Sequence, residues 1–126
     1  MLSVARYGTN DLPRATAFYD AIAELLGASR IIDRLDLVAY KNPEGGMFLI
    51  GTPHEGDATI GNGTQMGFAA PSRALVDAVY ATAMARGGIC AGPPGVRGED
   101  GPNGFYAAYF RDPDGNKLMV MRRGVP

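Results

Sequence analysis

The sequence predicts an α+β fold in which two βαβββ repeats form curved mixed sheets around a cavity, with the helices on the outside. Two observations indicate this fold class. Hydrophobic residues pass from strand spacing to helical spacing twice along the chain. The two stretches also align with each other in sequence. In this alignment Val4 corresponds to Gln65, Tyr19 to Tyr80, and Gly27 to Gly88.

A single domain is expected to hold both repeats, because a length of 126 residues suits one hydrophobic core. We expect the first repeat over about 1–52, a linker over about 53–63 and the second repeat over about 64–122. Glycine and proline gather between the ordered segments, where they indicate turns rather than a low-complexity tail.

The first repeat opens with an apolar stretch of strand length, from Leu2 to Gly8. Asp11 then supplies a helix N-cap, and Pro13 fits the first helical turn. Apolar residues recur at helical spacing until Gly27 stops the helix. Three strands are expected to follow, over 30–34, 36–41 and 47–51.

The second repeat has the same plan. A strand over 64–70 leads to Ser72, which is expected to cap a helix that stops at Gly87 and Gly88. Three more strands are expected, over 89–92, 104–111 and 116–122. Arg97 falls in a long loop before the second of these strands, where it either covers the mouth of the cavity or fixes the loop through Glu99 or Asp100.

The composition excludes several classes of function. The formal net charge is −1 and the basic residues are scattered, so the chain lacks the clustered Lys and Arg of a nucleic-acid or membrane surface. Cys90 is the only cysteine, which excludes an intrachain disulfide framework and fits a reducing compartment. Its apolar neighbours predict that it is buried. No membrane span or signal peptide is recognisable, so a cytoplasmic location is expected.

Two motifs carry a resemblance to a known family. The segment NDLPRATAFYD, from Asn10 to Asp20, resembles the first helix of vicinal oxygen chelate proteins, the superfamily of glyoxalases, bleomycin-resistance proteins and extradiol dioxygenases. The segment FYAAYFRDPDGNKL, from Phe105 to Leu118, is similar to the closing signature of that superfamily, an aromatic strand followed by a DPDGN turn and a final strand. The resemblance covers nearly the whole chain and implies the same two-repeat fold.

Members of this superfamily usually hold one divalent metal through a His on the first strand, a His on the fifth and a Glu on the eighth, and sometimes a Glu on the fourth. The resemblance places Val4, Gln65 and Met119 at the first three positions, and Leu49 or Ile50 at the fourth. None of these is a good ligand for a hard or borderline divalent ion. The resemblance therefore implies a site without a metal cofactor. His54, the only histidine, falls in the linker.

Residues two apart on a strand share a face, so the neighbours of these positions are expected to line the cavity. The predicted ligand-binding residues are Val4, Arg6, Gln65, Tyr109, Met119 and Met121. Lys117 shares the face of Met119, and further candidates are Tyr40, Met47 and Leu49.

Each candidate residue can also be explained by a purely structural role. Arg6 is either a cationic contact for a carboxylate, phosphate or sulfonate or half of a salt bridge at the edge of its strand. Gln65 either contacts a ligand through its amide or satisfies backbone groups. Tyr109 and the two methionines fit core packing as well as contact with an apolar ligand.

Three classes of function remain open. The first is a binding protein that holds a small molecule without a metal, for sequestration or sensing, with an anionic group at Arg6 and Gln65 and an apolar body on Tyr109 and the methionines. The second is a lyase, isomerase or dioxygenase-type enzyme of the same superfamily with a rearranged site. The third is a decayed member kept as a structural or regulatory partner. We favour binding and assign no catalytic residue. The resemblance also implies a homodimer, and the sequence leaves open whether the cavity lies within one chain or across a dimer.

Overall fold

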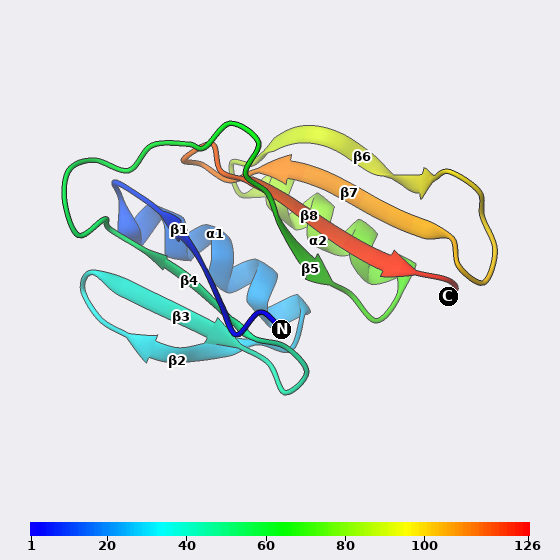
Figure 1. The fold of residues 1–126 in the computed structure, drawn as a ribbon, viewed down its shortest axis with the longest axis horizontal. Helices are drawn as coiled ribbons and strands as arrows, with labels where there is room; N and C mark the ends of the chain where they lie inside the picture. Colours follow the sequence, from blue (N-terminus) through cyan, green and yellow to red (C-terminus); the bar gives the residue numbers. More distant parts are fainter.

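The structure, a computed structural model, describes all residues 1–126 and contains two consecutive βαβββ units. The first unit consists of β1 (Val4–Gly8), α1 (Leu12–Leu25), β2 (Ser29–Asp33), β3 (Leu37–Lys41) and β4 (Met47–Gly51). The second consists of β5 (Met66–Ala69), α2 (Arg73–Ala85), β6 (Ile89–Arg97), β7 (Phe105–Arg111) and β8 (Lys117–Arg123). Figure 1 shows the two units side by side. The predicted fold class is confirmed.

Each unit contributes one four-stranded mixed sheet, with the order β1-β4-β3-β2 in the first and β5-β8-β7-β6 in the second. The first strand of each unit runs parallel to its last strand, and the remaining pairs are antiparallel. The sheets are separate and neither closes into a barrel. β1 and β5 therefore each have one hydrogen-bonded neighbour and one free edge.

Local side-chain chemistry sets the ends of both helices. The side chain of Asp11 accepts a hydrogen bond from the backbone N–H of Arg14 at 3.1 Å, and that of Ser72 accepts one from Leu75 at 3.1 Å. Beyond the C-terminal ends, Gly27 and Gly87 adopt positive φ values of 67° and 95°. Side chains other than glycine rarely adopt this conformation, so the two glycines end the helices where the sequence predicts.

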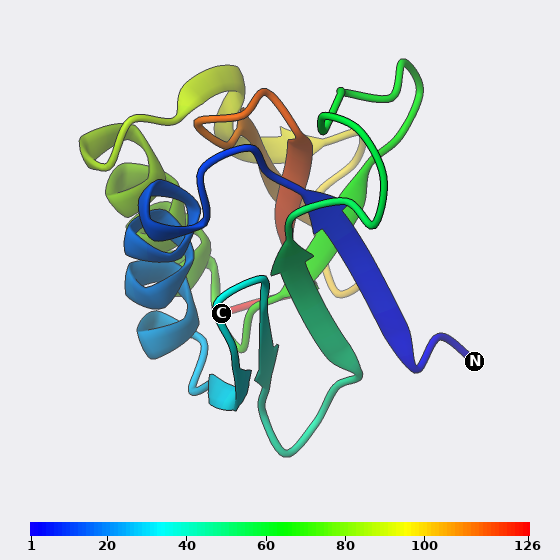
Figure 2. The same cartoon turned by 90° about the vertical axis from the view of Figure 1, so that its left-hand side faces the viewer.

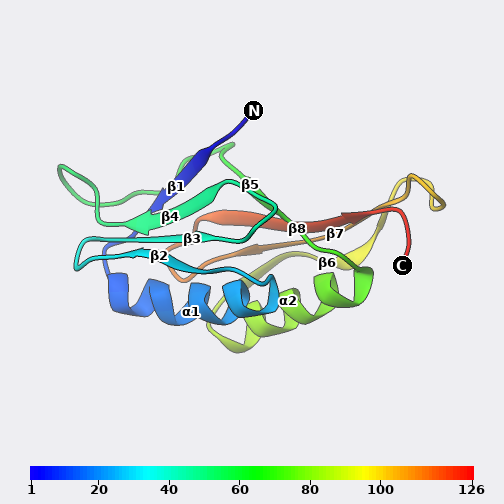
Figure 3. The same ribbon diagram turned by 90° about the horizontal axis from the view of Figure 1, so that it is seen from below.

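The core lies between the two helices and the two sheets. Figures 2 and 3 show α1 and α2 next to each other in one layer, with both sheets in a second layer. Equivalent positions of the two helices face the core, and at most 2% of their surface is exposed: Ala15, Phe18 and Ile22 in α1, and Val76, Val79 and Ala83 in α2. No helix covers the opposite face of either sheet, which we call the open face (Figure 3).

A turn in the second unit ties the two units together. Asp112 Oδ1 accepts hydrogen bonds from the backbone N–H groups of Asp114 and Asn116, both at 2.9 Å, which forms the tight DPDGN turn. The amide of Asn116 donates to the carbonyl oxygen of Gly8 at 3.0 Å, and the hydroxyl of Tyr7 donates to that of Lys117 at 2.6 Å. These contacts hold the end of β1 beside the start of β8.

β6 differs from the sequence-based prediction. It was expected to end at residue 92, but it continues to Arg97, so Arg97 lies in a strand and not in a loop. Pro93 and Pro94 have no backbone N–H group to donate, and β6 tolerates them because it is an edge strand with register shifts on both sides of Gly92. Cys90, on the same strand, is exposed, so the prediction that it is buried is wrong.

Neither helix has the length and apolar character that a membrane-spanning helix requires.

Candidate functional site

Three of the predicted ligand-binding residues lie together on the open face of the second sheet. Leu118 and Val120 are fully buried beneath the helices, so the alternating residues Met119 and Met121 point to the other face. On β7, Tyr109 is the register partner of Met119, and Ala107 is that of Met121. The alternation predicted from the sequence thus brings one tyrosine and two methionines together.

Two cations lie close to the ring of Tyr109. The guanidinium carbon of Arg97 and the Nζ atom of Lys117 each lie 5.6 Å from the ring centroid. The guanidinium is also held by backbone carbonyl groups of its own strand, at 2.9 Å from Gly95 and 2.7 Å from Pro93. We call Arg97, Tyr109 and Lys117 the Tyr109 platform.

Gly92 makes room for this arrangement. It is the register partner of Tyr109 on β6. A Cβ atom at position 92 would lie 3.2 Å from the ring of Tyr109 and 3.3 Å from a guanidinium nitrogen of Arg97, which is tighter than ordinary van der Waals contact. A side chain here would therefore require the ring or the guanidinium to shift by a few tenths of an ångström.

No carboxylate neutralises the two cations. None of the five ion pairs in the structure includes Arg97 or Lys117. Asp100, one of the two partners expected for Arg97, pairs with Arg73 at 2.6 Å instead. The prediction that Arg97 fixes a loop through Glu99 or Asp100 is therefore wrong, and the platform keeps two uncompensated positive charges.

The first sheet carries the other part of the predicted site. Val4 is 43% exposed, and Arg6, next on the same face, is also exposed. Leu49 is the register partner of Arg6, whereas Ile50 is fully buried in the core. Of the two candidates for the fourth-strand position, Leu49 is thus the one on the open face.

Arg6 does not form the salt bridge considered from the sequence. Its Nη2 atom donates a 2.7 Å hydrogen bond to the carbonyl oxygen of Thr52, and it is in no ion pair. Asp36 forms its ion pair with Arg34, whose hydrogen bond lowers the pKa of that carboxyl, and the nearby charge of Arg6 helps to lower it further. One nitrogen of the Arg6 guanidinium is therefore held by the backbone beyond β4.

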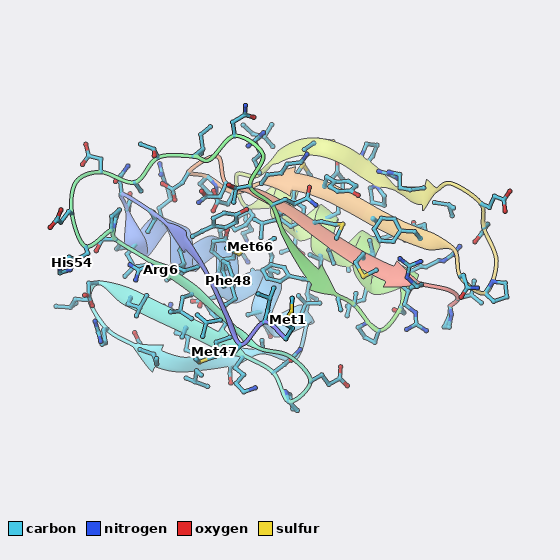
Figure 4. All side chains as sticks on the ribbon, viewed as in Figure 1. Met1, Arg6, Met47, Phe48, His54 and Met66 are labelled. Atoms are coloured by element: carbon cyan, nitrogen blue, oxygen red, sulfur yellow. The ribbon has the colours of Figure 1, made fainter.

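Three further candidates lie outside the open faces or at their margin. Gln65 is exposed and precedes β5 by one residue. His54 is exposed on the loop beyond β4, at the outer edge of the molecule (Figure 4). Tyr40 is 4% exposed in the core, and its hydroxyl donates to Asp20 at 2.6 Å, so it does not line the open face as the sequence suggested.

The residues at the metal positions of the family do not fit a divalent ion. Val4, Met119 and Leu49 offer no oxygen or nitrogen donor, and Gln65 offers a single neutral amide. No group of three His, Cys, Asp or Glu side chains in the structure could hold a metal ion.

Two cavities lie between the units, and neither coincides with the predicted set. The larger, of about 290 Å³, lies on the helix side of the first sheet, between α1, the β3–β4 turn and β5, and contains none of the six predicted residues. The smaller, of about 160 Å³, lies where β1, β4 and β5 approach one another, and Val4 borders it. Figure 4 shows Phe48 and Met66, which line this smaller cavity, in the middle of the molecule.

The fold and the open faces define a class of protein with two βαβββ units in one chain and a candidate site on exposed sheet faces. The sequence profile of the Glyoxalase/Bleomycin resistance protein/Dioxygenase superfamily matches residues 2–120. The chain therefore belongs to this superfamily, as the two sequence motifs predict.

Solved structures support the same assignment. A glyoxalase/bleomycin resistance protein from Albidiferax ferrireducens T118 is 40% identical, with 98% of each chain covered and a TM-score of 0.87. A lactoylglutathione lyase from Agrobacterium tumefaciens is 23% identical over 96% of this chain and 92% of that one, with a TM-score of 0.64. A glyoxalase-related enzyme from Fulvimarina pelagi is 18% identical over 96% and 86%, with a TM-score of 0.71. No curated protein sequence matches the chain significantly.

Proposed function

We propose that this protein binds a small molecule without a metal, on the open faces of its sheets, for sequestration or sensing. The observation that carries the proposal is the chemistry of these faces. Tyr109, Met119 and Met121 on the second sheet are suited to contact with an apolar or aromatic body. Val4 and Leu49 on the first sheet are also apolar, and neither can coordinate a metal.

The binding site is completed by a second copy of the chain. α1 and α2 occupy one layer, so both open faces point away from it and no element of the same chain covers them (Figure 3). Exposed apolar side chains such as Val4 favour association, because their burial removes apolar surface from water. In a two-fold homodimer, the first sheet of one chain covers the second sheet of the other, and the same contact occurs twice.

The fold alone does not carry a catalytic activity to this chain. The relative named as a lactoylglutathione lyase is 23% identical, and superfamily folds host many functions. The enzyme alternative therefore requires its own evidence, namely a metal or a reacting pair of side chains. We place the protein in the cytoplasm, since a single free cysteine suits a reducing compartment.

The first test is elemental analysis of protein purified without chelators and then incubated with nickel, zinc, manganese or iron. Metal well below one equivalent per chain supports binding without a metal. About one tightly held metal per chain would overturn the proposal and favour an enzyme with a rearranged site. His54 would then be the first side chain to replace.

A further inference from the structure

We propose that the ligand carries an anionic group, a carboxylate, phosphate or sulfonate, and that the Tyr109 platform binds this group. The inference rests on the proposed function, because it assumes that a small molecule occupies the open face of the second sheet. It goes further by naming the charge of the ligand and the three residues that select it, Arg97, Tyr109 and Lys117.

The first argument is electrostatic. Arg97 and Lys117 both approach the ring of Tyr109 to 5.6 Å. Two positive charges this close to one ring repel each other, and the negative face of the ring offsets only part of that repulsion. No carboxylate of the chain is paired with either cation. A bound anion would supply the negative charge that no carboxylate of the chain provides to Arg97 and Lys117.

The second argument concerns the hydroxyl of Tyr109. The hydroxyls of four other tyrosines each donate a hydrogen bond of 2.6 Å within the chain: Tyr7, Tyr19, Tyr40 and Tyr106. The hydroxyl of Tyr109 has no such partner in the chain. It is therefore a free donor on a ring that two cations approach, which suits an acceptor that carries negative charge.

The third argument is that the platform is preorganised. Two carbonyl groups of β6 fix the guanidinium of Arg97, and the absence of a side chain at Gly92 lets it lie against Tyr109. A cation that is already fixed loses less conformational entropy when it binds an anion. Arg6 is less fixed, because it makes one backbone hydrogen bond, to the carbonyl of Thr52, and packs on no aromatic ring. The anionic group is therefore expected at Arg97 and Lys117 rather than at Arg6.

The surroundings of the platform also orient the rest of the ligand. Met119 lies opposite Tyr109, and Met121 lies opposite Ala107, two residues further along β7. Ala107 itself is fully buried beneath its neighbours, so the apolar surface here is formed by the two methionines. An apolar body attached to the anionic group can therefore extend from Tyr109 over Met119 and Met121.

The test compares two probes with the same ring system and different charge, 2-naphthoate and its neutral amide, 2-naphthamide. Binding of each to the full chain is measured by titration calorimetry and by protein NMR at low and at physiological salt. We expect 2-naphthoate to bind about tenfold more tightly than 2-naphthamide, since a hydrogen bond to a charged group has about this effect. Salt should weaken only the binding of the anionic probe.

Variants then show which residues cause the preference for 2-naphthoate over 2-naphthamide. Lys117→Met and Arg97→Gln should each reduce the preference for 2-naphthoate several-fold and leave the affinity for 2-naphthamide within about twofold. The matched controls are Lys41→Met and Arg86→Gln. Lys41 is the only other lysine, and its amino group contacts the carbonyl of Gly45. Arg86 is exposed at the end of α2. Both controls should retain the full preference.

The outcomes separate the two proposals. A preference for 2-naphthoate that disappears in Lys117→Met and Arg97→Gln, and persists in both controls, supports the platform. Equal affinity for the two probes leaves the proposed function standing and overturns the inference. If Lys117→Met and Arg97→Gln still bind 2-naphthoate more tightly than 2-naphthamide, the inference is overturned as well. If neither probe binds at millimolar concentration, the proposed function fails, and the inference fails with it.

Discussion

The hydroxyl of Tyr19 in α1 donates a 2.6 Å hydrogen bond to Oδ2 of Asp112, in the turn that precedes β8. This contact joins the helix of the first unit to the signature turn of the second, and both side chains are 1% exposed. Asp112 also accepts a 2.9 Å hydrogen bond from the side chain of Asn116 at the same oxygen. The carboxylate is thus a central acceptor between the two units.

Tyr19→Phe should destabilise the protein by about 1.5–3 kcal/mol. The substitution removes a buried hydrogen bond and leaves the carboxylate of Asp112 with one donor fewer. Burial raises the pKa of Asp112, and the hydrogen bond from Tyr19 opposes that rise. The measurement is urea denaturation at neutral pH. The control is Tyr106→Phe, whose hydroxyl donates to Asp77 at an exposed site, and it should change stability by less than about 1 kcal/mol. Equal losses in the two variants would contradict the role given to Tyr19.

The pH dependence of stability should include a contribution from Asp20. Burial raises the pKa of this carboxyl, but hydrogen bonds from Arg30 and Tyr40 lower it by more, so the net pKa lies below the ordinary value of 3.8. A lowered pKa in the folded state gives stability that is present above the ordinary value and is lost as the pH falls through the folded value. The side chain is 47% exposed, so solvent screening limits the contribution to about 0.5 kcal/mol.

Asp20→Asn should therefore reduce stability at pH 7 and make the loss of stability between about pH 5 and pH 2 less steep. Thermal unfolding measured across this range checks the expectation. Asp57→Asn, in the exposed linker, is the control for the removal of one carboxylate. An acid transition in Asp20→Asn that follows the transition of the unmodified chain would refute the assignment.

Local chemistry made both helices predictable from the sequence. A capping side chain at Asp11 or Ser72 and a glycine with positive φ act within one turn of the helix, so no knowledge of the fold is needed. The shared face of Tyr109, Met119 and Met121 was equally accessible, because strand alternation has a period of two.

Contacts between distant segments were not predictable in the same way. Arg97 lies against Tyr109 from β6, a strand with register shifts and two neighbouring prolines, and neighbouring prolines in a sequence normally indicate a loop. The hydrogen bond of Arg6 to the carbonyl of Thr52 depends on the parallel pairing of β1 with β4. Two signals in the sequence pointed to the platform: Tyr109 as a predicted ligand-binding residue, and Lys117 on the face of Met119.

The larger cavity predicts a stabilising substitution. Ala23 lines the cavity of about 290 Å³ beside α1 and is 8% exposed. Ala23→Leu should place apolar volume in this space and raise stability by about 1 kcal/mol, since filling a cavity adds contacts without straining a packed core. Ala81→Leu, at an exposed position of α2, is the control and should have little effect. A lower melting temperature for Ala23→Leu would indicate that the cavity is too narrow for the added side chain.

The proposed dimer predicts different effects for two leucines. Leu49 lies on the open face of the first sheet, as the register partner of Arg6, whereas Leu35 lies between β2 and β3 and is 100% exposed. Leu49→Asp should dissociate the dimer, because a carboxylate in a covered apolar face loses its water without a matching partner. Leu35→Asp should leave the mass in solution unchanged. Analytical ultracentrifugation measures both, with circular dichroism to confirm that each variant is folded. A monomeric unmodified chain, or a dimer that persists in folded Leu49→Asp, would mean that the open faces do not meet across two chains.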